Sequence, residues 1–481
     1  MVQLRHSTVR VGRAPVCGWR QNFTRREQNG RPSTGSFDSC LAGRLPEHFS
    51  EENRPRMSEF VQIGDVSPYP VQPGSRRAYH AMVKPTGSIC NLDCTYCYYL
   101  HKKELLGTQN KFRISDEILE THIRQYIEGQ DRDEVVFSWQ GGEPTLLGIE
   151  FFEKVIELER KYKKPNQRIE NDLQTNGTLL NDDWGAFLKQ HRFLVGLSID
   201  GPEELHDQYR IAKDGKPTFD KVYAAAQLLH SHGVPFNALC VVNRLNAQHP
   251  REVYRFIRNE ISPRQMQFIP CVEPKVFRNT APQHWDPATL PVQGSPEARP
   301  GHPDSVVTDW SVDPDDWGTF LCKVWDDWYR RDIGKVFVNH FESAAAVWMG
   351  KDAQMCVYHQ FCGKGVALEH DGSLYSCDHY VYPEYKLGNI QQVSSSRMVF
   401  SDRQREFGFG KFHSLPQQCL DCSFLFACNG ECPKNRLIRT RSGEPGLNYL
   451  CSGFQKFWHH IDNEMKDICR NIATGRRPGP R

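Results

Sequence analysis

Short apolar runs alternate with amphipathic stretches between about residues 78 and 331. The runs are rich in β-branched and aromatic residues, as buried strands are, and the stretches between them carry apolar residues at the helical period. We predict strands at His80–Lys84, Val135–Trp139, Glu170–Thr175, Leu194–Ile199, Phe236–Val242 and Met266–Pro270. Helices are predicted near 115–128, 149–163, 181–190, 218–232, 249–260 and 314–331.

This alternation predicts an α/β fold with parallel strands and right-handed crossovers. The six strand–helix units match an open, partial (β/α)6 barrel better than a closed barrel of eight units. Reactive residues of parallel barrels lie at the C-terminal ends of the strands. The polar motifs Gly141–Pro144, Gln174–Gly177 and Ser198–Pro202 follow the second, third and fourth predicted strands, so we expect them at the barrel mouth.

The segments outside this barrel have a different texture. Residues 1–75 are rich in Arg, Ser, Gly, Pro and Asn, a composition that predicts a disordered leader, and Met57 is a hypothetical true start. The barrel is predicted over 76–350, with a Pro/Gly-rich insertion at about 279–312 that is either a surface loop or a substrate lid. Cys, Gly and aromatic residues dominate at 351–460, which predicts a small metal-stapled domain. A final helix is expected at about 453–472, so that residues 461–481 form the C-terminal helix and tail.

Charge and composition narrow the functional classes. The formal net charge is +2 over 481 residues, so no global field favours nucleic acid or an anionic membrane as partner. No stretch approaches the roughly 18 apolar residues of a membrane helix. The chain has 17 cysteines but no apolar run after its basic N-terminus, so a secretory signal is not evident. We therefore expect a cytoplasmic protein whose thiolates hold metal rather than form disulfides.

Cys90, Cys94 and Cys97 form a C-x3-C-x2-C loop directly after the first predicted strand. Three thiolates on one short loop can hold three irons of a [4Fe–4S] cube. The fourth iron is then open to the amine and carboxylate of S-adenosylmethionine (SAM), which supplies the radical chemistry. A zinc loop is the alternative, but zinc sites usually take four ligands in paired C-x2-C halves, and no fourth ligand lies nearby.

Eight further cysteines gather in the C-terminal region: Cys356, Cys362, Cys377, Cys419, Cys422, Cys428, Cys432 and Cys451. Eight thiolates suit two complete four-cysteine [4Fe–4S] clusters, and two zinc ribbons remain the alternative. The other six cysteines receive no role: Cys17, Cys40, Cys240, Cys271, Cys322 and Cys469.

Several longer motifs resemble a known family. Phe137–Leu146, Leu173–Thr178, Gly196–Pro202 and His206–Arg210, together with the Cys90–Cys97 loop, resemble the anaerobic sulfatase-maturating enzymes of the radical SAM superfamily. The run Cys419–Cys432, with Cys451 downstream, resembles the SPASM domain of peptide-modifying radical SAM enzymes. The resemblance covers about 80–465 without the insertion.

The resemblance implies a set of cofactor contacts. Tyr96, Gly142, Ser198 and Arg210 are expected to contact SAM, with Val272 near its adenosine, and a serine hydroxyl and an arginine fork suit these tasks. The alternative for Arg210 is a salt bridge on a helix face. The Glu143 carboxylate, within the Gly141–Pro144 turn, is an expected acceptor for the SAM amine.

An interlaced ligand assignment also follows from the resemblance. It gives the first auxiliary set as Cys356, Cys362, Cys377 and Cys432, and the second auxiliary set as Cys419, Cys422, Cys428 and Cys451. With the SAM-binding cluster this makes three [4Fe–4S] clusters. All eight auxiliary positions would be filled, which favours electron relay over binding of substrate to an open iron.

Asp378 follows Cys377 directly. The resemblance makes its carboxylate the proton acceptor of the reaction. A carboxylate that only tunes the neighbouring cluster is the alternative, and His379 is a less favoured base.

The implied reaction is oxidation of a cysteine or serine of a sulfatase to Cα-formylglycine. A 5′-deoxyadenosyl radical takes a hydrogen from the substrate Cβ, Asp378 takes the side-chain proton, and an auxiliary cluster accepts the second electron. The implied partners are a sulfatase polypeptide with a Cys/Ser-x-Pro-x-Arg motif and an electron donor such as flavodoxin or ferredoxin.

Three alternatives to this reaction remain. They are another SPASM maturase that crosslinks a different peptide, a zinc scaffold without catalysis, and an inactive regulatory homologue.

Overall fold

The structure is a computed structural model that describes residues 77–99, 102, 105, 113–276 and 286–479. The leader over 1–75, the alternative start Met57, Cys17, Cys40 and the first part of the insertion therefore lie outside the described residues.

The barrel strands lie where the apolar runs predict them. They are β1 (His80–Lys84), β2 (Glu134–Trp139), β3 (Arg168–Thr175), β4 (Leu194–Ser198), β5 (Phe236–Val242) and β6 (Gln265–Pro270). Each is parallel to its neighbour, and β7 (Phe337–Val338), which was not predicted, extends the same edge. The predicted fold class, a partial α/β barrel with a C-terminal SPASM domain, is confirmed.

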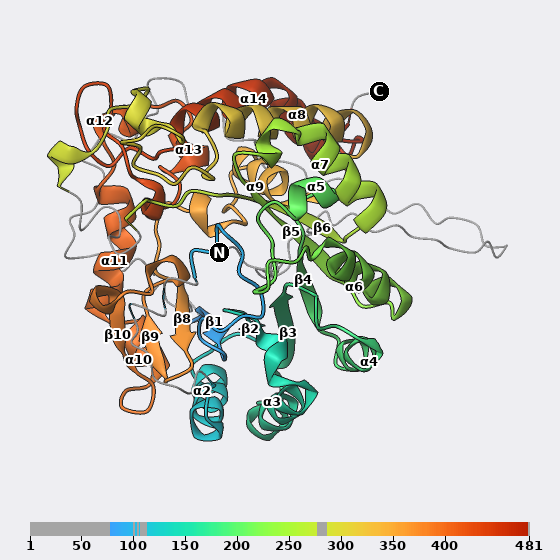
Figure 1. The fold of residues 1–481 in the computed structure, drawn as a ribbon. Coiled ribbons are helices and arrows are strands. Elements are labelled where there is room, and N and C mark those ends of the chain that lie inside the picture. Colours follow the sequence, from blue (N-terminus) through green and yellow to red (C-terminus); the bar gives the residue numbers. More distant parts are fainter. Residues whose placement is uncertain (1–76, 100–101, 103–104, 106–112, 277–285, 480–481) are drawn as a thin grey trace, which may run out of the picture. The chain divides into compact units, whose positions relative to one another are not determined.

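The predicted helices form between these strands. They are α2 (Asp116–Glu128), α3 (Ile149–Tyr162), α4 (Asp182–Gln190), α6 (Phe219–Ser231), α7 (Pro250–Phe256) and α8 (Pro314–Arg331), and a π-helical turn (Ile257–Ile261) continues α7. Figure 1 shows α2, α3, α4 and α6 on the outer side of the strands. The starts of α2 and α4 are set by side chains that cap free backbone donors: Ser115 accepts from Ile118 N at 3.2 Å, and Asn181 accepts from Trp184 N at 3.0 Å.

The C-terminal region continues the sheet of the barrel. Strand β8 (Gly365–Glu369) pairs parallel with β1, and β9 (Ser373–Tyr375) and β10 (Lys386–Asn389) follow it as antiparallel strands. The strand order is β10-β9-β8-β1-β2-β3-β4-β5-β6-β7. Figure 1 labels every strand of this order except β7. Because an open edge of β1 would leave backbone groups unpaired, β8 completes the sheet at that edge.

Several helices beyond residue 331 were not expected from the pattern. They are α9 (Asn339–Trp348), α10 (Ser395–Val399), α11 (Asp402–His413), α12 (Gln417–Leu420) and α13 (Leu425–Cys428). Helix α11 buries Gln404, Gly408 and Lys411 instead of an apolar stripe, so its sequence lacks the helical hydrophobic period.

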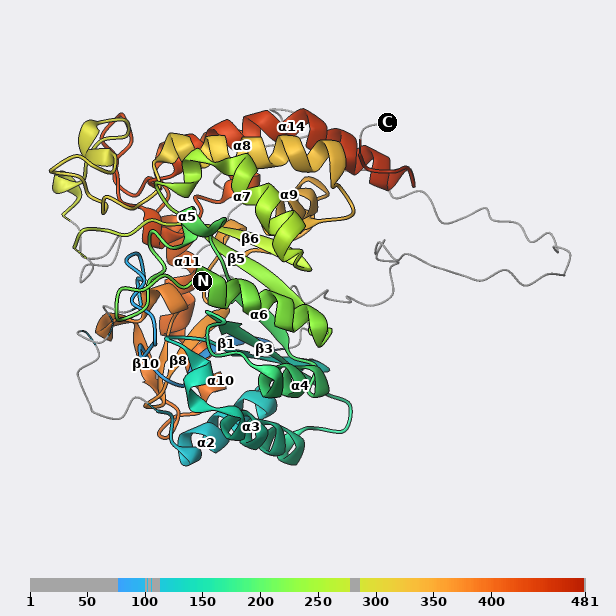
Figure 2. The same cartoon turned by 45° about the vertical axis from the view of Figure 1, so that its right-hand side comes forward.

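The last helix, α14 (Cys451–Ala473), holds the C-terminal region against the barrel. It runs beside α8 (Figure 2). The two backbones touch at glycines: a Cβ on Gly453 would lie 2.1 Å from Pro314 O, and a Cβ on Gly318 would lie 2.5 Å from Gly453 O. Apolar residues of the barrel, α8 and α14 form one continuous core. None of the described helices is both long and apolar enough to cross a membrane.

Candidate active site

The Cys90–Cys97 loop is held at the C-terminal end of β1 by the segment that follows α5 (Glu203–His206). Leu92 forms an antiparallel bridge with Ala212, Asp93 N donates to Ile211 O at 2.9 Å, and Thr95 N donates to Tyr209 O at 3.0 Å. These backbone contacts bring the cysteine loop and Arg210 to the same place.

The three thiols of this loop are a donor set that fits a metal cluster. Burial, together with the neighbouring thiols, raises the pKa of Cys90 to about 11 and that of Cys94 to about 12. Cys90 Sγ accepts from Leu92 N at 3.3 Å and from Asn176 Nδ2 at 3.6 Å. Thiols this buried need a bound cation to become thiolates, which a cluster iron supplies.

A buried carboxylate, Asp200, joins two of the residues predicted to contact SAM. The hydroxyl of Tyr96 and the Nε of Arg210 both donate to Asp200 Oδ2, the latter at 3.0 Å, and Val241 N donates to Oδ1 at 2.9 Å. Among the described residues, Arg210 makes its side-chain hydrogen bond through Nε alone, so its terminal nitrogens are left for a ligand. The salt-bridge alternative and the ligand role of Arg210 are therefore compatible.

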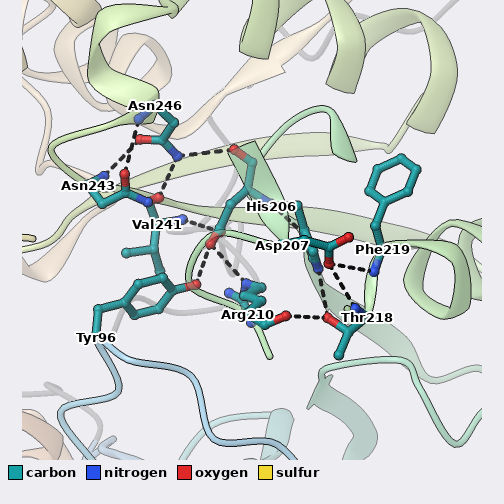
Figure 3. A network of polar contacts seen from close by, with 10 residues as sticks. Tyr96, His206, Asp207, Arg210, Thr218, Phe219, Val241, Asn243 and Asn246 are labelled. Carbon is teal, nitrogen blue, oxygen red and sulfur yellow. Dashed lines mark hydrogen bonds and ion pairs between the residues drawn. The ribbon is translucent and has the colours of Figure 1, made fainter. Parts of the chain in front are cut away.

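The surroundings of Asp200 fix this arrangement (Figure 3). Asn246 Nδ2 donates to Asp200 O at 3.1 Å, and Thr218 Oγ1 donates to Arg210 O at 2.7 Å. Asp207 in turn accepts from Thr218 N at 2.8 Å. The sequence analysis assigned Asp200 no role of its own, and its only signal was its place in the Ser198–Pro202 motif.

The turn after β2 packs tightly against the chain that leads into the cysteine loop. A Cβ on Gly142 would lie 1.8 Å from Ile89 O, so only glycine fits this approach. The buried Glu143 carboxylate accepts from Thr145 N and Oγ1 at 3.1 and 2.7 Å, from Thr175 Oγ1 at 2.8 Å and from Asn176 N at 2.8 Å. Three of these bonds end on Oε1 and one on Oε2, and together they tie the turn after β2 to the end of β3. Its predicted contact with the SAM amine stays a prediction.

Ser198 and Val272 follow the same strand edge. Ser198 is the last residue of β4, and in the described part of the chain its hydroxyl has no protein partner. Val272 comes two residues after β6 and is buried, and its carbonyl accepts from Lys434 Nζ at 3.3 Å. Both side chains thus lie at C-terminal strand ends, where ligands of parallel barrels bind.

Asp378 reaches the barrel mouth from the C-terminal region. It forms a buried ion pair with Lys84, the last residue of β1, and accepts from the Tyr98 hydroxyl at 2.8 Å. The two charged side chains are 1% and 0% exposed. Burial by itself would raise the pKa of Asp378, but the Lys84 ammonium holds it well below its ordinary value. Asp378 is therefore an ionised acceptor at neutral pH.

Lys84 and Tyr98 are site residues that the sequence analysis missed. A lysine at the end of an otherwise apolar strand was the available signal for Lys84, because buried lysines are rare without a partner. His379, the less favoured base, lies with its Nδ1 3.3 Å from Cys432 Sγ, and burial lowers its pKa well below the ordinary value.

The electrostatic neighbours of the C-terminal thiols fall into two groups. Burial, together with the neighbouring Cys362 and Cys356, raises the pKa of Cys377 to about 12. The same three thiols act on the buried Cys432. Near the other group, burial and then Cys419 and Cys422 raise the pKa of Cys428, and Cys451 responds to these same three. The assignment of ligands to the two auxiliary sets, which the family resemblance implies, stays a prediction.

The donor chemistry of these eight thiols suits iron–sulfur cubes, which take cysteine thiolates as ligands. In the part of the chain that the structure describes, no three His, Cys, Asp or Glu side chains converge to hold one metal ion. Zinc ribbons also take four thiolates, so the residues alone leave both kinds of site open.

Comparisons with known proteins agree with this geometry. Residues 85–257 match the model of the radical SAM superfamily, and residues 356–423 match the SPASM iron–sulfur cluster-binding domain. The chain is 45% identical to the serine-type anaerobic sulfatase-maturating enzyme of Bacteroides thetaiotaomicron, over 83% of this chain and 93% of that protein. It is 32% identical to the cysteine-type enzyme of Clostridium perfringens, over 81% and 98%.

Solved structures are similar as well. The structure described as native anSMEcpe with bound AdoMet and Cp18Cys peptide matches with a TM-score of 0.69 and 32% identity, over 82% of this chain and 100% of that one. Streptococcus suis SuiB shares the fold with a TM-score of 0.51 at 15% identity, over 78% and 77%.

Proposed function

The chain belongs to the anaerobic sulfatase-maturating enzymes, radical SAM proteins with a SPASM domain, and from this we propose that it oxidises a sulfatase side chain. The product is Cα-formylglycine, made from a cysteine or a serine. The observation that supports this most is the buried, ionised Asp378, which a segment next to Cys377 brings beside Lys84 and Tyr98 at the barrel mouth. A chain that only generated radicals would have no need of such a base.

The side chains of the site divide the work. Cys90, Cys94 and Cys97 would hold the SAM-binding cluster, and the two auxiliary sets would hold the other two. When bound, SAM and the three [4Fe–4S] clusters supply the hydrogen-abstracting radical and the acceptor for one electron. The terminal nitrogens of Arg210 and the hydroxyl of Ser198 suit the polar groups of SAM, and Val272 offers an apolar contact for its adenosine.

Asp378 carries the proton step. Conversion of a serine side chain to an aldehyde removes one hydrogen atom from Cβ, one proton from the hydroxyl and one electron. Asp378 accepts the proton, Lys84 keeps the carboxylate ionised until then, and the Tyr98 hydroxyl orients it. A cysteine substrate loses the same three particles, and water then converts the thioaldehyde to the aldehyde with release of hydrogen sulfide.

The proposal extends to partners and location. Relatives in solved structures hold a bound peptide, which supports a peptide segment of a sulfatase as the substrate. We propose that the target residue lies in a Cys/Ser-x-Pro-x-Arg motif. The proposed donor of the first electron is a flavodoxin or ferredoxin. The proposed setting is the cytoplasm, with neither nucleic acid nor membrane as partner.

Anaerobic turnover of two matched peptides tests this function. The peptides carry the motif with cysteine or serine at the target position, and a third carries alanine as the control. We expect an aldehyde in at least one of the first two, detected by mass spectrometry and by a carbonyl-reactive probe, and none in the third. A dehydrogenated product without a reactive carbonyl would instead identify a crosslinking maturase and contradict the proposal.

Paired cysteine variants are expected to separate the two auxiliary sets. The unaltered chain should take up about twelve irons on anaerobic reconstitution, four for each cube. Cys377→Ala with Cys432→Ala removes two ligands of one set and should leave about eight irons. The variant with Cys428→Ala and Cys432→Ala changes two residues that are closer in sequence but removes one ligand from each set. It should leave about four irons. Equal iron content in the two double variants would contradict the interlaced assignment.

A further inference from the structure

Arg436 is a fully buried cation. Its side chain is 0% exposed, and it lies just after the turn Pro433–Asn435. Nη1 donates to Ser414 Oγ at 2.7 Å, but Nε and Nη2 have no hydrogen-bond partner among the residues that the structure describes. Among the described residues, no carboxylate forms an ion pair with it. A buried guanidinium without a counter-charge destabilises the fold, as any unpaired buried charge does. Arg436 therefore needs a negatively charged group nearby.

The guanidinium lies against the loop that joins the two auxiliary sets. Cys428 of the second set and Cys432 of the first set flank Gly430, and a Cβ on Gly430 would lie 2.8 Å from Arg436 Nη2. Gly430 has a φ of +68°, so the lack of a side chain here both permits the backbone turn and leaves room for the guanidinium.

Arg436 lies close to both sets through this loop, because its Nη2 approaches Gly430, which is two residues from Cys428 and two residues from Cys432. A cation in this position can stabilise negative charge on either set.

Lys411 of α11 provides a contrast. It is 1% exposed, and its ammonium donates to the carbonyls of Val357 at 2.7 Å, Cys356 at 3.4 Å and His359. Cys356, whose carbonyl is one of these acceptors, belongs to the first set. Lys411 thus has its donors satisfied and faces one set, whereas Arg436 has free donors and faces two.

We propose that Arg436 is the shared counter-charge of the two auxiliary clusters and that it raises the reduction potentials of both. Four thiolates give each bound cube a net negative charge, and reduction adds another. A cation buried between two such groups favours their reduced states, since net charge and hydrogen bonds to sulfur set the potential of a cluster. The unused Nε–H and Nη2–H groups are the donors for cluster sulfur. The inference rests on the auxiliary clusters of the proposed function, and it assigns Arg436 a positioning role in electron relay.

Redox titration of the reconstituted chain, followed by electron paramagnetic resonance, tests the proposal. Arg436→Gln keeps a donor for Ser414 and removes the charge. We expect both auxiliary potentials to become more negative in this variant, with the SAM-binding cluster unmoved. Lys411→Met should move one auxiliary potential. Arg258→Met is the matched control, because Arg258 pairs with Asp332 at 2.7 Å beside the barrel helices and should move none.

Two unmoved auxiliary potentials in an iron-replete Arg436→Gln variant, or a shift confined to one cluster, would overturn the proposal. If that variant takes up too little iron, Arg436→Lys decides. Arg436→Lys keeps the positive charge, so its auxiliary potentials should stay above those of the Arg436→Gln fraction that does bind iron, and equal potentials in the two variants would overturn the proposal.

The outcome is separable from the proposed function. Shifted potentials in a chain that makes no aldehyde would support the shared counter-charge and reject sulfatase maturation. If the auxiliary potentials do not change in Arg436→Gln but the unaltered chain converts the peptide to the aldehyde, sulfatase maturation is supported and the shared counter-charge is rejected. A natural chain that binds only about four irons would remove the auxiliary clusters and this inference together.

Discussion

Asp378→Asn is expected to lower formylglycine formation by roughly 10²–10⁴-fold, the usual contribution of a general base, while cleavage of SAM continues. Asparagine keeps the size of the side chain and its contact with Tyr98 but cannot take the substrate proton. The two readouts are aldehyde by mass spectrometry and 5′-deoxyadenosine by chromatography, measured in the same anaerobic reaction.

The ratio of the two products is what decides the role of Asp378. A base is needed after hydrogen abstraction, so its loss uncouples SAM cleavage from product. A carboxylate that only tuned the neighbouring cluster would uncouple the two products only by shifting the potential of that cluster, which a redox titration of the variant measures. Full aldehyde yield from Asp378→Asn would reject the assignment. His379→Gln serves as the control for the alternative base.

Lys84→Met is expected to make the rate of aldehyde formation fall as the pH decreases below neutral. The unaltered chain should show no such fall near neutral pH. The ammonium holds the pKa of Asp378 below its ordinary value, so its removal lets burial raise that pKa. Below the new pKa the base is already protonated, and aldehyde formation falls with decreasing pH. The measurement is the rate of aldehyde formation between pH 5 and 9, with 5′-deoxyadenosine as the internal standard. A pH profile identical to that of the unaltered chain would contradict the role of Lys84.

The same substitution should lower the free energy of unfolding by about 3–5 kcal/mol, because it leaves a carboxylate buried without its partner. In the unaltered chain the folded-state pKa of Asp378 lies below its unfolded value of about 3.9, so the pair stabilises the fold above that pH. This contribution is lost as the pH falls through the folded-state pKa. The double variant Lys84→Met/Asp378→Asn removes both charges and should regain much of the stability but not the activity.

The C-terminal sheet explains how Asp378 comes to face Lys84. Strand β8 pairs along the whole of β1, with Glu369 opposite Lys84, and β9 pairs back on β8. Asp378 follows β9 by three residues, so the chain re-enters the barrel mouth beside the last residue of β1. In the proposed function, the auxiliary domain would thus complete the active site as well as hold clusters.

The barrel and its cysteine loop were predictable from the sequence, because their signals are local. Apolar runs of β-branched and aromatic residues, such as Val135–Trp139, indicate strands wherever they occur. The spacing of Cys90, Cys94 and Cys97 brings three thiols onto one loop whatever the rest of the chain does. The division of eight further thiols into two sets depended on family resemblance, since their order along the chain permits several pairings.

Other features were decided by the tertiary structure alone. The pairing of β1 with β8 joins residues that lie almost 300 positions apart; Met82, for example, pairs with Ala367. No local sequence pattern encodes this pairing. Lys84 forms its ion pair with Asp378 because that strand pairing brings the two residues together. Arg436 is buried beside the Cys428–Cys432 loop, which its own position in the sequence does not indicate. The sequence by itself determined which chemistry the chain carries, through thiol spacing and strand-end motifs. Only the folded chain decided which buried charges share a site, because the energy of a buried charge depends on neighbours that are remote in sequence.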